Sequence, residues 1–128
     1  MMTLLLFAAA TADLAALDQA VARCDRAVAN PAFASEAGRR SQFLLQTYRD
    51  QEAIVAARLG TAERRRLLRE ASGKTAAEEQ AIVLEEAAIE DRQRALNDRR
   101  MLEGIRQDAI DAMRRHFLAQ CPVGTNRK

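Results

Sequence analysis

The 128-residue sequence has little of what small globular domains use to fill a core. It has no Trp, and aromatic residues make up only 4% of the chain. Two prolines and five glycines leave most of the chain free to form long helices. A chain of this length forms one domain with a modest core. We therefore expect a core built from small and aliphatic side chains on helices.

Histidine is nearly absent, since His116 is the single one. Nucleophilic catalysis needs a hydroxyl or thiol held beside a base, and no motif here supplies that pair. A Cys/His zinc site needs four ligands, but the chain has only Cys24, Cys121 and His116. Met113 stands where a helical di-metal site needs a Glu three residues before the His. No Gly-rich phosphate loop occurs. We predict a protein without enzymatic activity, cofactor or metal.

A charge excess of one sign is also missing. The 20 Lys and Arg residues are nearly balanced by 18 Asp and Glu, for a formal net charge of +2. Nucleic-acid-binding domains usually carry a clear basic excess, so this balance disfavours nucleic acid as a partner. The densest basic run, Arg64-Arg65-Arg66, lies between Glu63 and Glu70. We regard this run as the candidate interaction site.

A long hydrophobic run occurs only over residues 1–12, MMTLLLFAAATA, which contain no charged side chain. Two interpretations stay open. The segment is either the remnant of a secretory signal, ending in the small residues before Asp13, or the apolar start of the first helix. No Lys or Arg precedes the run, as one would in a complete signal. Asp13 and Asp18 interrupt it before the ~20 apolar residues that a bilayer requires, so no stable membrane span is predicted.

Apolar residues three and four positions apart predict a first helix over residues 13–29. Asn30-Pro31 is expected to end it, because the residue before a proline is disfavoured in the α conformation. Ser35 is then the expected N-cap of the next helix.

A second and a third helix are predicted over residues 36–71 and 75–120, separated by the turn Ser72-Gly73-Lys74. The expected fold is all-α: a long, coiled-coil-like antiparallel helical hairpin with the short first helix packed at its base. Residue i of the second helix should face roughly residue 147 − i of the third. Residues 13–121 form a single domain in this prediction, and residues 122–128 form a flexible tail.

One apolar stripe on each long helix is predicted to line the hairpin. The inward residues expected on the second helix are Leu44 or Leu45, Tyr48, Val55, Leu59 and Ala62, with Leu67 and Leu68 near its end. The third helix has a seven-residue repeat of Ala81, Ala88, Ala95, Leu102 and Ala109, with Ile82, Ile89 and Leu96 beside it. Stripes rich in alanine also allow close packing with a second copy, so a homodimer is a candidate assembly.

Cys24 lies on the first helix and Cys121 at the end of the third. We predict a disulfide between them, and their spacing excludes a CxxC redox motif. In the chain-entropy model, a bond that closes a loop this long stabilises the fold by about 4–5 kcal/mol. An even cysteine count agrees with an oxidising compartment. The alternative is two thiols in a cytosolic protein.

These observations predict an exported bacterial protein, periplasmic or secreted, that acts through protein–protein contacts. It would serve as an adaptor, a chaperone-like protein or a structural subunit. The alternative hypothesis is a cytoplasmic Arg-rich module that binds nucleic acid or an acidic protein through Arg64, Arg65 and Arg66. No motif identifies the protein partner.

Overall fold

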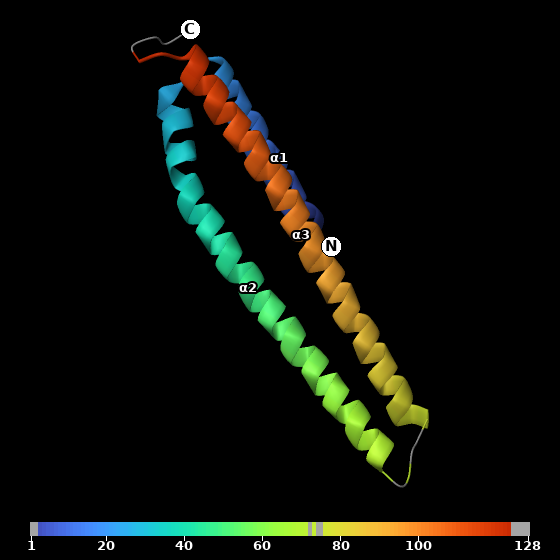
Figure 1. The fold of residues 1–128 in the computed structure, drawn as a ribbon. Coiled ribbons are helices and arrows are strands. Elements are labelled where there is room, and N and C mark those ends of the chain that lie inside the picture. Colours follow the sequence, from blue (N-terminus) through green and yellow to red (C-terminus); the bar gives the residue numbers. More distant parts are fainter. Residues whose placement is uncertain (1–2, 72, 74–75, 124–128) are drawn as a thin grey trace. The chain divides into compact units, whose positions relative to one another are not determined.

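The computed structural model describes residues 3–71, 73 and 76–123, with side chains from Asp13 onward. All regular structure in this part of the chain is helical (Figure 1). The helices are α1 (Thr3–Ala22), α2 (Arg26–Glu70) and α3 (Ala76–Gln120). The long helices α2 and α3 run antiparallel and pack against each other, which confirms the all-α helical hairpin.

The chain divides into two compact units. Unit 1 comprises Met1–Ser41 and Leu102–Lys128, and it therefore contains α1, the first part of α2 and the last part of α3. Unit 2 comprises Gln42–Met101, the remainder of both long helices and the turn between them. Unit 1 is thus built from three helices and unit 2 from two.

The predicted boundary between the first two helices is wrong. The first helix was expected over residues 13–29, but α1 ends at Ala22, and Pro31 lies inside α2. A proline inside a helix costs about 3 kcal/mol through a lost hydrogen bond and a clash one turn back. Complete burial of Ala29 and the packing of Phe33 against the core offset this cost. Ser35 is not an N-cap, because its hydroxyl donates to the Ala32 carbonyl within α2.

The turn between α1 and α2 is centred on Cys24, whose φ of 53° lies in the left-handed region. The Cys24 N–H donates to the Val21 carbonyl at 3.1 Å, and the Asp25 N–H donates to the Ala20 carbonyl at 2.8 Å. This pair of bonds is the Schellman motif, in which glycine usually occupies the left-handed position. Asp25 then caps α2 by accepting a hydrogen bond from the Val28 N–H.

The end of α2 and the start of α3 lie close to their predicted positions. The second and third helices were predicted over residues 36–71 and 75–120, and α2 ends at Glu70 while α3 begins at Ala76. α2 continues without a break through Gly60. Ser72, Lys74 and Thr75 lie outside the described residues.

The ends of the chain fit the prediction less directly. Residues 3–12 are helical within α1, a conformation that both interpretations of this segment allow. In the predicted tail, Pro122 and Val123 follow the end of α3, and residues 124–128 lie outside the described part of the chain.

The apolar core of unit 1 brings all three helices together. Phe33 and Phe117 pack with ring centroids 5.8 Å apart. The buried members of this core are Leu17, Val21, Cys24, Ala29, Ile110, Phe117 and Cys121. Leu17 and Val21 are among the apolar residues whose spacing predicted the first helix, and both are buried in this core, whereas Val28 at the same spacing lies on α2 and is exposed.

The seam of unit 2 is narrow, and the stripes predicted to line it are wrong. Its apolar cluster consists of Ile54, Ile89 and Leu96, with Ala57 packed against it. Most of the residues expected there on α2 point outward instead, although Leu68 near its end is half-buried. The exposed fractions are 68% for Leu44, 50% for Leu45, 61% for Tyr48, 45% for Val55 and 67% for Leu59, and Ala62 is exposed as well.

On α3 the error is one residue. Ile82, Ile89 and Leu96, which lie beside the predicted alanine repeat, are buried, whereas Ala81, Ala88, Ala95 and Leu102 are exposed and Ala109 is half-buried. One residue turns a helix by about 100°, so the adjacent stripe faces the seam. Both series repeat every seven residues, so their spacing alone does not distinguish the inward stripe from the outward one.

On α2 the inward stripe was missed because two of its members are threonines. Thr47 and Thr61 are buried, at 3% and 4% exposure. The Thr47 hydroxyl donates to the Phe43 carbonyl and the Thr61 hydroxyl donates to the Arg58 carbonyl, both at 2.9 Å. Since each hydroxyl is satisfied by its own helix, each threonine can face the seam despite its polarity.

Candidate functional site

The described residues contain no group of three or more His, Cys, Asp or Glu side chains that could hold a metal ion. The features that remain as candidates are the disulfide, a buried charge cluster with an adjoining cavity, the arginine run and the exposed apolar side chains. The first two lie in unit 1. The arginine run and most of the exposed apolar side chains lie in unit 2.

Cys24 and Cys121 form the predicted disulfide, with Cα atoms 5.5 Å apart. Both residues are buried, at 2% and 5% exposure. The bond joins the turn after α1 to the residue that follows α3, across 97 positions of the sequence. A disulfide of this kind persists in oxidising compartments.

Arg26 reinforces the same end of unit 1. Its guanidinium donates to the carbonyl of Cys121 at 2.6 Å and to the carbonyl of Pro122. It also lies over the Phe117 ring, 5.9 Å from the ring centroid. A cation here satisfies carbonyls at the end of α3 and complements the negative end of its dipole. No feature of the sequence indicated this role, because residue 26 was expected inside the first helix, whereas it begins α2.

A cluster of buried charges lies between α2 and α3 in unit 1. Arg106 donates to both carboxylate oxygens of Glu36, at 3.0 and 3.1 Å, and to both of Glu103, each at 3.0 Å. The exposed fractions of the side chains are 9% for Arg106, 11% for Glu36 and 13% for Glu103. One guanidinium thus serves two carboxylates with bidentate geometry on each side.

The cluster extends outward through Arg40. Its guanidinium donates to Glu36 at 3.1 Å and to Asp111 at 2.8 Å. The hydrogen bond to Asp111 is the main cause of the raised pKa of Arg40, and it holds the pKa of Asp111 below its ordinary value. Every buried side-chain nitrogen and oxygen of the described residues has a hydrogen-bond partner. The cluster is therefore a satisfied structural network.

The pKa values within the cluster show which interactions dominate. Burial is the largest single influence on Glu103 and raises its pKa, but hydrogen bonds from Arg106 and Gln107, with the charges of Arg106 and Arg39, together lower it below the ordinary value. The pKa of Arg106 is raised, chiefly by its hydrogen bond to Glu103. The sequence did not predict that Glu36, Glu103 and Arg106 pair with one another. Glu36 was expected in the first turn of the second helix.

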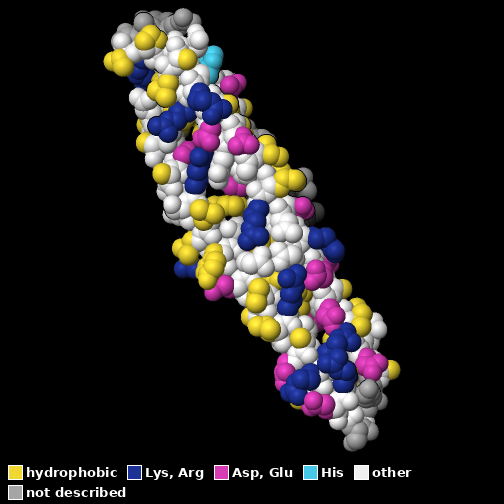
Figure 2. Space-filling model, viewed as in Figure 1, with side chains coloured by type: hydrophobic (Ala, Val, Ile, Leu, Met, Phe, Trp, Pro, Cys, Tyr) yellow, Lys and Arg dark blue, Asp and Glu magenta, His cyan; other side chains and the backbone are white. Residues whose placement is uncertain are grey.

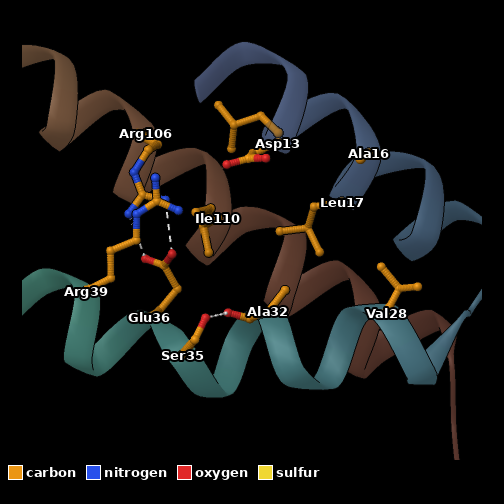
Figure 3. A pocket seen from close by; sticks show the side chains of 11 residues that line it. Asp13, Ala16, Leu17, Val28, Ala32, Ser35, Glu36, Arg39, Arg106 and Ile110 are labelled. Atoms are coloured by element: carbon orange, nitrogen blue, oxygen red, sulfur yellow. Dashed lines mark hydrogen bonds and ion pairs between the residues drawn. The ribbon is translucent and has the colours of Figure 1, made fainter. Parts of the chain in front are cut away.

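A cavity of about 230 Å³ adjoins the cluster in unit 1 (Figure 3). Leu14, Leu17 and Ile110 supply part of its apolar wall, and Glu36, Arg39 and Arg106 lie together at one end. Arg106 and Glu36 are already engaged with each other, as the dashed lines show. The cavity therefore offers apolar walls beside the paired charges of Glu36 and Arg106, with Arg39 and Asp13 also in its lining.

The arginine run that we selected as an interaction site is paired with acidic residues of unit 2. Arg64 forms an ion pair with Glu85, and Arg65 forms one with Glu86 at 2.5 Å. Arg66 pairs with Glu63 and Glu70 on its own helix. The pairing across the hairpin follows the predicted antiparallel register to within a few residues.

Polar pairs continue along the seam of unit 2. Gln51 and Gln93 exchange hydrogen bonds at 2.8 and 3.1 Å, and Arg58 pairs with Glu90 at 3.0 Å. Such pairs set the register of two helices more than they stabilise them, because exposed ion pairs contribute only about 0–1 kcal/mol each.

Unit 2 exposes more large apolar side chains than it buries. Nine are exposed and four are buried among its described residues. The exposed ones are Leu44, Leu45, Tyr48, Val55, Leu59, Leu67, Val83, Leu84 and Met101. Figure 2 shows hydrophobic side chains gathered along the middle part of α2, beside a row of basic and acidic side chains. Exposed apolar groups collected on one element are typical of interaction surfaces.

None of the described helices is long and apolar enough to cross a membrane. Comparison of the chain with protein-family models, with curated proteins and with solved structures gives no significant match.

Proposed function

We propose that this is an exported, non-enzymatic helical protein of the periplasm or extracellular space, which acts by binding other proteins as an adaptor, chaperone-like protein or structural subunit. The observation that carries the proposal is the excess of exposed over buried apolar side chains in unit 2. A two-helix element with so small a core gains stability when a partner covers its apolar faces.

The disulfide supports the export part of the proposal. Cys24 and Cys121 are joined and buried, and such bonds are rare in the reducing cytosol. The bond replaces some of the stability that a larger apolar core would otherwise supply to a small domain.

The cytoplasmic, nucleic-acid-binding alternative receives less support from the ion pairs. Each member of the run Arg64, Arg65 and Arg66 is engaged by a carboxylate. A phosphate would have to displace these carboxylates, and the nearby acidic side chains would repel it. Replacing all three arginines with Gln should therefore leave partner binding intact under the proposal.

The proposal is tested by photo-crosslinking in the native cell. A photoreactive amino acid replaces Leu84, which is 62% exposed on α3 of unit 2, and the matched control replaces Arg94, whose side chain is 71% exposed on the same helix. We expect a crosslink to a second protein from Leu84 and none from Arg94, since an apolar contact should surround the first position only.

Intact mass, measured on the recovered protein with and without reductant, tests the compartment. An oxidised chain gains two hydrogen atoms on reduction. A chain that is fully reduced in the cell, with equal crosslinking from both positions, would contradict the proposal.

A further inference from the structure

The outward face of α2 in unit 2 carries a second heptad-like stripe. Its members follow one another at alternating intervals of three and four residues, the spacing by which one helix packs along another. They are Leu45, Tyr48, Glu52, Val55, Leu59 and Ala62. We call these six residues the outer stripe. Because Ile54 and its neighbours already line the inward seam, α2 presents apolar spacing on two sides.

The outer stripe is large enough to support a specific contact. Its four large apolar members are between 45% and 67% exposed. At these fractions they present on the order of 500 Å² of surface, near the upper end for the largest apolar patch of a monomer. Two such faces together would bury about 1,000 Å², which is the lower bound of a specific protein–protein interface.

The charge of unit 2 favours a second copy as the occupant. Residues 42–101 contain eleven basic and eleven acidic side chains, so their formal net charge is zero. A neutral element does not repel its own copy, and it does not attract a strongly charged partner. The spacing of the outer stripe suits packing along another helix, and the same stripe of a second copy provides one.

We propose that two copies of this chain associate through their outer stripes, with the two α2 helices antiparallel about a point between Glu52 and Val55. In this alignment Tyr48 packs against Leu59 of the second copy. A parallel alignment would place the two Glu52 carboxylates in one layer, where like charges repel. The inference rests on the proposed function, because it names one partner for the apolar surface of unit 2.

Sedimentation equilibrium of the purified full-length chain, oxidised, tests the inference. We expect wild type to have twice the 14.2 kDa mass of the chain. Leu59→Glu should weaken association ~100-fold, because symmetry places the charge in the interface twice. Leu118→Glu is the matched control, since Leu118 in unit 1 has the same 67% exposure, and it should leave the dimer intact.

A variant that is expected to tighten the dimer distinguishes a change in the interface from a folding defect. Glu52→Leu completes the outer stripe and should tighten the dimer by ~10-fold or more. A monomeric wild type would overturn the inference, and so would a dimer dissociated by Leu84→Glu but not by Leu59→Glu. A monomer that still crosslinks to another protein from position 84 would leave the proposed function standing, so the two failures are distinguishable.

Discussion

The two units use the same pair of helices in different ways. In unit 1 the apolar stripes of α2 and α3 are covered by α1, and the disulfide ties the three helices together. In unit 2 the same two helices share a seam of few apolar residues, and much of their aliphatic surface is exposed. The larger apolar core thus occurs in the unit where a third helix covers α2 and α3.

The two units also differ in the kind of polar residue that they bury. Unit 1 buries the ion cluster around Arg106, where covering helices exclude water and each charge needs a partner. Unit 2 instead buries the hydroxyls of Thr47 and Thr61, which their own helix satisfies. Loss of one partner should therefore be far more damaging in unit 1 than in unit 2.

The largest expected effect is loss of the disulfide in unit 1. Relative to the oxidised wild type, the double variant Cys24→Ala, Cys121→Ala should lower the free energy of unfolding by about 4–5 kcal/mol. In the same Cys121→Ala background, Cys24→Gly should be less damaging than Cys24→Ala by about 1 kcal/mol, because Gly adopts the left-handed conformation without the penalty of a Cβ. Urea unfolding followed by circular dichroism measures both values. A glycine variant no more stable than the alanine variant would show that the turn is not strained.

The next effect comes from the buried ion cluster. Arg106→Met leaves Glu36 and Glu103 buried without their main partner and should cost about 3–5 kcal/mol. Adding Glu36→Leu and Glu103→Leu should restore most of that stability. The control Arg94→Met removes an exposed pair in unit 2 and should change stability by about 0–1 kcal/mol. Equal losses from the two arginine variants, seen by urea unfolding, would contradict the contrast between the units.

The smallest expected effect is a dependence of the stability of unit 1 on pH. The pKa of Glu103 lies below its ordinary 4.5 in the folded protein, so the unfolded chain takes up the proton first as the pH falls. The stabilisation is complete above pH 4.5 and is lost as the pH falls through the lower pKa of the folded state. Thermal unfolding should show this decline, and Glu103→Gln should make it shallower. Hydrogen exchange should locate the loss in unit 1, and equal loss in both units would be the contrary result.

Much of the fold could be predicted because its signals are local. The turn near Gly73 separates two helical patterns, and the predicted helix ends there lie within a residue of Glu70 and Ala76. The pairing of Cys24 with Cys121 followed from their places on the first and last helices. Proline was misleading at position 31, because its conformational preference was outweighed by the burial of its neighbours.

The sequence did not show which apolar stripe of each long helix faces the seam, because each long helix carries two such stripes. Polar residues interrupt both inward stripes, Thr47 and Thr61 on α2 and Glu103 on α3, so the outward stripes were chosen. One signal was available: Glu103 lies seven residues after Leu96 and seven before Ile110, both buried. A charge in that register indicates a buried partner, here Arg106.

The position of the disulfide also has a consequence for the order of folding. Few residues separate α1 from α2 and α2 from α3, so each pair of neighbouring helices can form from nearby parts of the chain. Cys24 and Cys121 can meet only after α3 has been synthesised and docked, because 97 positions separate them. Oxidation is therefore a late event that records completion of the fold. A chain truncated within α3 would keep a free thiol and remain open to recognition by quality control.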